Sequence, residues 1–339
     1  MDKLIILILS LVTNGLIIYF SSWILKHYRY QGIQSIHQGN IPRLGGISIY
    51  LGLLVSIFIG LSITQNFIVK ISLALLPLFL VSLREDLKHD VRPIYRLLVA
   101  ILSALIMVYF FGTLKNIDLP FLPTIVNSSI FLILLTLLAF TAITHAFNII
   151  DGLNGLAVLV YWSILGCLYF MSHNLSDQLF KELTFLGLLI PLGFFIFNYP
   201  FGKIFLGDTG AYILGFICAA ITIYFFNQNP QLMSWQAILI LIYPITEVIY
   251  SFVRRLAKGL SPLHPDDQHL HTFMYRHLKE KKYSNKNANN LATIMMLPFI
   301  GFGPAINLLL PVNLIFIFLV ITFYLVCFIR TYKYLELNT

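Results

Sequence analysis

Long apolar runs constrain this chain more than any other feature of its sequence. About eleven runs, each near the 20 residues that cross a bilayer as an α-helix, follow one another between short polar segments. The runs lie at 4–25, 44–63, 67–83, 94–112, 124–146, 155–171, 181–197, 209–226, 235–252, 290–308 and 312–329. The chain is 58% hydrophobic and only 11% charged, against about 25% charged in soluble domains. The sequence therefore predicts one all-α membrane-embedded domain over 1–339, with about eleven transmembrane helices.

The distribution of lysine and arginine predicts how the chain crosses the membrane. With the N-terminus outside, eighteen of the 22 Lys and Arg residues fall on the inner side, and only Lys3, Lys70, Lys115 and Lys181 do not. This bias follows the positive-inside rule, so we expect a multi-pass protein of the bacterial inner membrane. The same rule explains the net charge of +8, and nucleic-acid binding is not expected.

Acidic residues gather on the same face, although topology does not require them there. Nine of the 14 acidic residues fall inside: Glu85, Asp86, Asp90, Asp151, Asp208, Asp266, Asp267, Glu280 and Glu336. Carboxylates and cations together at span ends are what chemistry on an anionic, metal-bound substrate requires. The predicted active site therefore lies on the cytoplasmic face.

The segment between the third and fourth runs is the first candidate for chemistry. The adjacent acids Glu85 and Asp86 lie among four cations, of which Arg96 is the last. Adjacent carboxylates repel each other unless a cation lies nearby, so the pair indicates handling of Mg²⁺ or of protons near phosphate. A solvated, salt-bridged loop is the alternative explanation.

A second candidate segment combines an amide, a carboxylate and glycines. Asn148 and Asp151 are three residues apart and would share one helix face at the inner end of a span. Gly152 would let the backbone approach a ligand closely, and Asn154 follows it. A helix C-cap is the structural alternative, but it explains one polar residue and one glycine rather than the whole set.

A third candidate segment precedes the eighth run. Lys203 is its only cation, and Asn198 lies at its start. Phe205 is consistent either with an interfacial aromatic residue or with a surface on which a base stacks. Asp208 is consistent with an N-cap of the following helix or with a functional carboxylate.

The long inner segment 254–290 is rich in histidine and cations. His269 and His271 are two residues apart, whereas a helical zinc pair has a spacing of four, so we expect anion binding by these histidines with Arg276 rather than zinc. Glu247 is the one acid expected inside an apolar run, where it is either functional or paired with Arg254 or its neighbour Arg255. In the first inner loop, Arg43 taken alone indicates only a turn and a membrane anchor.

These segments, in this order, resemble the bacterial polyprenyl-phosphate N-acetylaminosugar-1-phosphate transferases of glycosyltransferase family 4. The family includes the phospho-N-acetylmuramoyl-pentapeptide translocase and enzymes that start O-antigen synthesis. The resemblance runs from His37 to His277. It rests on Pro42-Arg43-Leu44-Gly45-Gly46, Glu85-Asp86-Leu87 with Arg96, Asn148-x-x-Asp151-Gly152-x-x-Gly155-Leu156, Asn198 with Phe205-Leu206-Gly207-Asp208, and Arg254-Arg255 through His269-x-His271.

The resemblance implies roles for these residues. It implies catalytic roles for Glu85, Asp86, Asp151 and Asp208, with Asp208 and Asp151 as ligands of Mg²⁺, for which Mn²⁺ is a substitute. It implies substrate contacts for Arg43, Arg96, Asn148, Gly152, Asn154, Asn198, Lys203, Phe205, His269, His271 and Arg276. Among these, Phe205 would stack on uracil.

Three departures from the family pattern bear on the substrate. Glu85 and Asn154 each stand where many members have Asp, and Thr272 stands where a second consecutive His is common. None of these changes removes the carboxylates of Asp86 or Asp208, so we expect an active enzyme. The departure at Thr272 disfavours the peptidoglycan precursor as its substrate.

The sequence thus predicts an Mg²⁺-dependent glycosyl-1-phosphate transferase. It would move a sugar-1-phosphate from a UDP-N-acetylated amino sugar to undecaprenyl phosphate, release UMP, and initiate O-antigen or another cell-surface polysaccharide. A secondary transporter or lipid flippase is the alternative, although transporters place their ionisable sites near the bilayer midplane. The sequence does not identify the amino sugar, and it leaves open whether the chain forms a homodimer.

Overall fold

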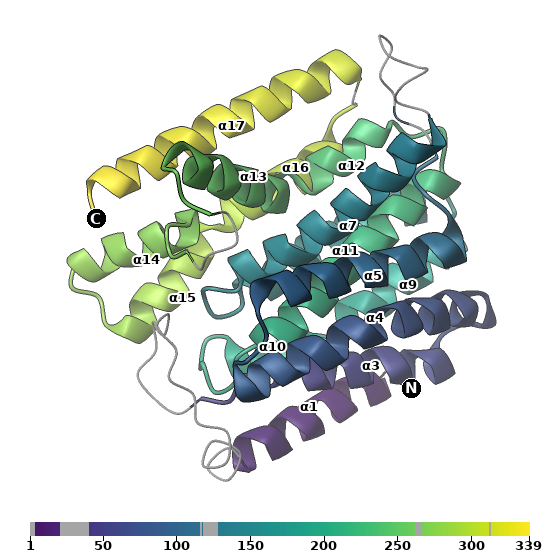
Figure 1. Ribbon diagram of the computed structural model, residues 1–339, viewed down its shortest axis with the longest axis horizontal. Coiled ribbons are helices and arrows are strands. Elements are labelled where there is room, and N and C mark those ends of the chain that lie inside the picture. The colour runs from purple at the N-terminus through teal and green to yellow at the C-terminus, as the bar shows by residue number, and fades with distance from the viewer. Residues whose placement is uncertain (1–3, 21–40, 116, 118–127, 262–265, 312) are drawn as a thin grey trace.

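The computed structural model describes residues 4–20, 41–115, 117, 128–261, 266–311 and 313–339. Within these ranges the chain is helical and has no strand, which confirms the all-α prediction. The helices run side by side as one bundle (Figure 1). They are α1 (Leu4–Tyr19), α3 (Gly45–Ile59), α4 (Ser62–Lys88), α5 (Pro93–Phe111), α7 (Ser129–Ile150), α8 (Leu156–Asn174), α9 (Gln178–Leu189), α10 (Leu192–Asn198), α11 (Gly207–Gln228), α12 (Ser234–Ile240), α13 (Ile242–Ala257), α14 (Leu270–Glu280), α15 (Asn285–Met295), α16 (Leu297–Leu309) and α17 (Leu314–Leu337).

The helices account for all the apolar runs. In the described ranges, eight helical segments are long and apolar enough to cross a membrane, with α9–α10 and α15–α16 each forming one segment. The pair α12 and α13, bent by 76°, forms a ninth if it is one broken span. The shorter apolar helices α1 and α3 fall within the two remaining runs. The chain is therefore a multi-pass membrane protein.

α11 is the central helix of the bundle. Its whole apolar stretch is buried, whereas only 22% of the corresponding stretches of α5 and α17 is buried. Small residues bring neighbouring helices close, as is typical in membranes. Gly46 of α3 lies against the backbone of Gly210, and a Cβ at Gly215 would lie 2.8 Å from the carbonyl oxygen of Ile143 in α7. This close packing holds the start of α11 in place. The third candidate segment of the sequence ends at this start of α11.

The outer helices present apolar side chains to their surroundings. Leu98, Leu102 and Leu105 of α5 are exposed, as are Leu319 and Phe323 of α17. Exposed apolar surface of this extent marks an interaction site with a membrane or a protein. On helices of this length and hydropathy it is the surface that faces lipid.

Proline lies at the sharp bend between α12 and α13 and at the break between α9 and α10. Pro244 is the third residue of α13 and has no N–H to donate to the carbonyl of Ile240, where α12 ends. Pro191 lies between α9 and α10. The bend at Pro244 changes the direction of the chain from α12 to α13. The last turn of α13 contains Arg254 and Arg255, and the helix ends at Ala257.

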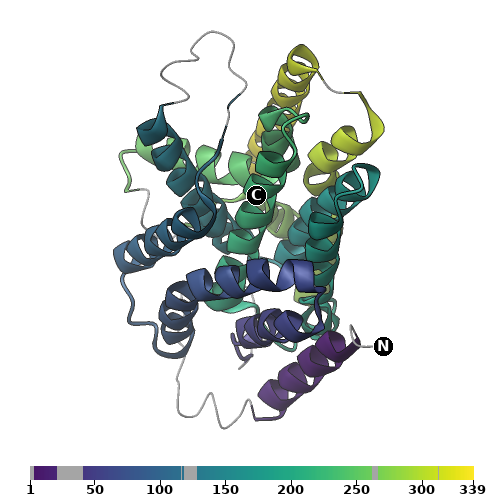
Figure 2. The ribbon, with the colours of Figure 1, turned by 90° about the vertical axis from the view of Figure 1, so that its right-hand side faces the viewer.

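The polar segments collect at one end of the bundle. α1 begins at the end of the bundle opposite to the one where α17 stops (Figure 1). A view turned by 90° again places α1 and α17 at opposite edges of the bundle (Figure 2). The segment 254–290 is largely helical, because it includes the end of α13, α14 and the start of α15. α14 and α15 lie at the end where α17 stops.

Candidate active site

Asp86, near the end of α4, holds the N-terminus of α11. Its carboxylate accepts hydrogen bonds from the backbone N–H groups of Asp208 and Thr209, at 2.8 and 2.9 Å, and from the Thr209 hydroxyl at 2.6 Å. A carboxylate at a helix N-terminus is stabilised by the unpaired N–H groups and by the helix dipole. Asp86 therefore positions Asp208, a function that the sequence pattern did not indicate.

Asp208 is held by two arginines. Arg96 of α5 donates a short hydrogen bond to it, and Arg43 approaches its other oxygen at 3.4 Å. Arg96 also lies 3.9 Å from Glu85. The prediction of Asp208 as an N-cap is wrong, because Asp208 is the second residue of α11 and its side chain makes no cap. Two arginines facing one buried carboxylate are a site that can exchange partners with an anion.

A short backbone pairing brings Arg43 to this site. Phe205 N–H donates to the Pro42 carbonyl, and Gly45 N–H donates to the Phe205 carbonyl, at 2.9 and 3.0 Å. Gly207 has φ +73°, and a Cβ there would collide with the Arg43 backbone and the Asp86 carboxylate. Glycine is required at this position both for its conformation and for space. His37, also part of the family resemblance, lies outside the described residues.

Asp151 lies in the same electrostatic environment. It caps the C-terminus of α7, and its carboxylate makes no hydrogen bond or ion pair with the residues that the structure describes. Burial raises the pKa of Asp151 well above its ordinary value; Arg43 opposes this shift, and the carboxylates of Asp208 and Asp86 add to it. Three carboxylates thus converge from α4, α11 and the end of α7.

The donor chemistry of the convergent carboxylates suits a Mg²⁺ ion. Mg²⁺ prefers oxygen ligands and usually takes one or two carboxylates together with water and substrate phosphates. Asp208 and the unpartnered Asp151 supply such a pair. Across the described ranges, no group of three or more His, Cys, Asp or Glu side chains forms a preassembled metal cage.

Asparagines line the loops beside the carboxylates. Asn148 donates to the Tyr212 hydroxyl at 3.3 Å, which ties α7 to α11. Asn198 accepts from the Gly155 N–H at 2.6 Å and donates to the Ile204 carbonyl at 2.7 Å, so it joins the loops 151–155 and 199–206.

The histidine pair lies beside the second candidate segment. The rings of His269 and His271 are stacked, with centroids 5.5 Å apart, and a Cβ at Gly152 would collide with the His271 ring. Burial, followed by the charge of His269, lowers the pKa of His271 well below its ordinary value, so His271 is neutral at pH 7. Only glycine at position 152 leaves room for this imidazole, and the predicted contact of Gly152 with a ligand stays a prediction.

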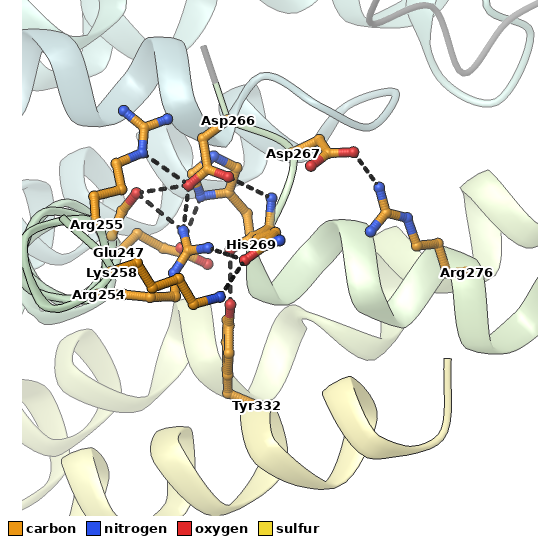
Figure 3. Close-up of polar contacts among 11 residues, drawn as sticks. Glu247, Arg254, Arg255, Lys258, Asp266, Asp267, His269, Arg276 and Tyr332 are labelled. Atoms are coloured by element: carbon orange, nitrogen blue, oxygen red, sulfur yellow. Dashed lines mark hydrogen bonds and ion pairs between the residues drawn. The ribbon is translucent and has the colours of Figure 1, made fainter. Parts of the chain in front are cut away.

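The buried Glu247 pairs with a histidine rather than with an arginine. Its Oε2 lies 3.6 Å from Nδ1 of His269, and Tyr243 donates to its Oε1 at 3.4 Å. Figure 3 shows Arg254 and its neighbour turned instead toward Asp266. The expected pairing of Glu247 with these arginines is wrong because Asp266, which follows the loop, takes both of them.

Two predicted phosphate contacts have other partners. The Lys203 ammonium lies 5.5 Å from the centroid of the Phe201 ring. Arg276 pairs with Asp267, as Figure 3 shows, and lies over the Phe273 ring. Neither cation is brought to Asp208 by a contact among the described residues.

The chain is similar to known proteins of one family. The model of the family described as "Glycosyl transferase family 4" matches residues 68–226. That range contains the ends of α4 and α7 and the start of α11, which carry the convergent carboxylates.

Similar curated proteins cover most of the chain. An undecaprenyl-phosphate alpha-N-acetylglucosaminyl 1-phosphate transferase of Thermotoga maritima is 30% identical over 250 residues, which are 73% of this chain and 72% of the relative. A probable undecaprenyl-phosphate N-acetylglucosaminyl 1-phosphate transferase of Bacillus subtilis is 26% identical over 70% of this chain and 66% of its own length. A decaprenyl-phosphate N-acetylglucosaminephosphotransferase of Mycobacterium leprae is 25% identical over 77% of this chain and 74% of its own. The chain thus belongs to the polyprenyl-phosphate N-acetylaminosugar-1-phosphate transferases of glycosyl transferase family 4.

Proposed function

We propose that this protein transfers a sugar-1-phosphate from a UDP-N-acetylated amino sugar to undecaprenyl phosphate, forming a polyprenyl-diphosphate sugar and UMP. The names of its relatives support this reaction class. The structural observation that carries the proposal is the pairing of buried Asp208 with Arg43 and Arg96. By analogy with relatives, the product would initiate O-antigen or another cell-surface polysaccharide.

The reaction needs positioning and charge neutralisation more than driving force. One phosphoanhydride replaces another, so the chemical free energy changes little, and catalysis depends on alignment and electrostatics. Arg43 and Arg96 already face an anion, and they can transfer their hydrogen bonds from Asp208 to phosphate oxygens. Asp86 keeps the start of α11 in place while this exchange occurs.

Asp208 and Asp151 would hold Mg²⁺, and Mn²⁺ would be a substitute. When bound, such an ion would supply positive charge that offsets the negative charge of the phosphates. The acceptor phosphate has a second pKa near 6, so it is largely ionised at pH 7 and needs no strong base. Glu85 would orient the acceptor phosphate through Arg96.

The substrates would occupy two sides of this centre. Asn148, Asn154, Asn198 and Phe205 would hold the nucleotide, because they lie at the ends of α7 and α10 or on the loops that follow these helices. His269 and His271 would lie toward the diphosphate. Lys203 and Arg276 would reach phosphate only by leaving their present aromatic and acidic partners.

The membrane arrangement follows from the lipid acceptor. We place about eleven spans in the bacterial inner membrane, with the N-terminus outside and the active site on the cytoplasmic face. The acceptor phosphate would then meet the carboxylates at the interface, while its isoprenoid chain stays among the apolar helix faces.

A direct assay tests the reaction. Purified protein, Mg²⁺, labelled UDP-GlcNAc and undecaprenyl phosphate should give UMP and a lipid-linked product, and chelation by EDTA should stop the reaction. UDP-GalNAc and 6-deoxy UDP-amino sugars should be tested in parallel, because the sequence does not identify the sugar. If no UDP-sugar gives a lipid product, the proposed function is wrong. If Asp208→Asn retains full activity, only the metal assignment is wrong.

A further inference from the structure

One face of α15 lies against two loops of the active site. Lys286, Asn289, Asn290 and Thr293 follow the spacing i, i+3, i+4, i+7 and so occupy one side of the helix. This helix belongs to the Lys- and Asn-rich part of the chain, to which the sequence motifs assign no chemistry.

Two side chains of this face bind the backbone of Asn154. The Asn154 N–H donates to Oδ1 of Asn289 at 3.0 Å, and the Thr293 hydroxyl donates to the Asn154 carbonyl at 2.9 Å. Asn289 and Thr293 are fully buried. Backbone groups of a buried, non-helical residue need partners, and here α15 supplies both.

The same face binds the neighbouring loop. Asn290 donates to the Pro200 carbonyl at 3.1 Å, and the Lys286 ammonium lies 5.5 Å from the Phe201 ring centroid. Between the loops, Gly202 has φ +62°, and a Cβ there would lie 3.0 Å from Nδ2 of Asn154. α15 therefore sets the spacing between the two loops as well as the position of Asn154.

Asn154 is buried, with 4% of its surface exposed, and the contacts from α15 use only its backbone. Its amide makes no hydrogen bond to the part of the chain that the structure describes, while its backbone N–H and carbonyl are both occupied. A primary amide offers two donors and an acceptor, which match the amide edge of a nucleobase. A fixed backbone with an unoccupied amide is suited to recognising a ligand at little cost in ordering.

We infer that Asn289 and Thr293 are positioning residues for the donor nucleotide, acting through Asn154. The inference rests on the proposed function, since it assigns the nucleotide to the loops 151–155 and 199–203. The residues do not touch the reacting phosphates, so their loss should weaken donor binding and leave acceptor binding unchanged.

The test compares Thr293→Val with Thr293→Ser. Valine keeps the shape but removes the hydroxyl donor, whereas serine keeps the donor. Asn289→Ala removes the acceptor, and Asn287→Ala, at an exposed position on the same helix, is the matched control. KM for the UDP-sugar, KM for undecaprenyl phosphate and Tm are measured for each protein in detergent with Mg²⁺.

We expect Thr293→Val and Asn289→Ala to raise KM for the UDP-sugar about fivefold, the effect of losing one hydrogen bond. KM for the acceptor should stay within about twofold, and Thr293→Ser and Asn287→Ala should resemble the wild type. Equal changes in both KM values, or donor KM values that do not differ between Thr293→Val and Thr293→Ser, would overturn the inference alone. A wild-type protein that turns over no UDP-sugar would overturn the proposed function together with it.

Discussion

Asp86 and Asp208 have the same side chain but different partners. Asp86 accepts hydrogen bonds from neutral N–H and hydroxyl groups, whereas Asp208 faces arginine side chains. A carboxylate bound by backbone N–H groups is part of the framework, and one bound by mobile cations can exchange partners. The sequence motif alone cannot distinguish these roles, because the donors to Asp86 lie 122 and 123 residues away.

At the scale of single residues, Arg96→Lys should reduce kcat by roughly tenfold to a hundredfold. One guanidinium nitrogen of Arg96, Nη1, contacts both Asp208 and Glu85, and the compact ammonium of lysine cannot reproduce the geometry of the planar guanidinium. Arg84→Lys is the matched control, because Arg84 forms an exposed ion pair with Asp90 and should change kcat by less than about twofold. Initial rates at saturating substrate measure both, and equal losses would contradict a specific role for Arg96.

At the scale of helices, the crossing of α3 and α11 leaves no room for a side chain. A Cβ at Gly46 would collide with the backbone of Gly210, so Gly46→Ala should lower the free energy of unfolding by about 1–3 kcal/mol. Gly166 in α8 has open space around it, and Gly166→Ala should be neutral or stabilising by up to about 1 kcal/mol. Thermal unfolding in detergent shows whether each variant is stabilised or destabilised. Destabilisation of both variants would argue against this packing.

Asp266 joins α13 to the segment that leads into α14, and its contribution to the stability of the fold should depend on pH. Burial raises the pKa of Asp266, but hydrogen bonds from Arg254 and Gln268 and the charge of His269 outweigh burial and depress it. A depressed acid pKa stabilises the fold above the unfolded-state value of 3.8, and this stability is lost as pH falls below it.

The corresponding experiment is the difference in Tm between the wild type and Asp266→Asn. Replacement should cost about 2 kcal/mol at pH 7, the scale of a charge-assisted hydrogen bond, and the difference should shrink below about pH 4. Asp267→Asn is the neighbouring control, because its pair with Arg276 is exposed and should contribute little. A difference that is constant from pH 7 to pH 3 would contradict the assignment.

The sequence predicted the helices better than it predicted the contacts between distant segments. Apolar runs were sufficient to locate the apolar helices, since hydropathy over about 20 residues is a local property, while the number of spans stays a prediction. The pairing of Pro42 and Gly45 with Phe205 has no local signal, because neither segment resembles a strand. The partner of Glu247 was missed for the same reason. His269 lies beyond the end of α13, whereas Arg254 and Arg255 lie in the same helix as Glu247 and were the expected partners.

At the scale of the whole molecule, the proposed orientation predicts which residues can be labelled from outside the cell. In a Cys327→Ser background, a cysteine replacing Lys181 should react with a membrane-impermeant maleimide in intact cells. A cysteine replacing Lys282 should react only after the cells are permeabilised. The reverse pattern would invert the topology, whereas labelling of both in intact cells would show that the cells leak and would require a cytoplasmic marker as control.

The bonds from Asp86 to the start of α11 also bear on how the protein is made. α4 is synthesised more than a hundred residues before Thr209, so a nascent chain carries Asp86 without the groups that donate hydrogen bonds to its carboxylate in the finished protein. Burying an unpaired carboxylate is costly. The inner end of α4 should therefore stay in water until α11 inserts, and the arrival of α11 would be the step that assembles the site.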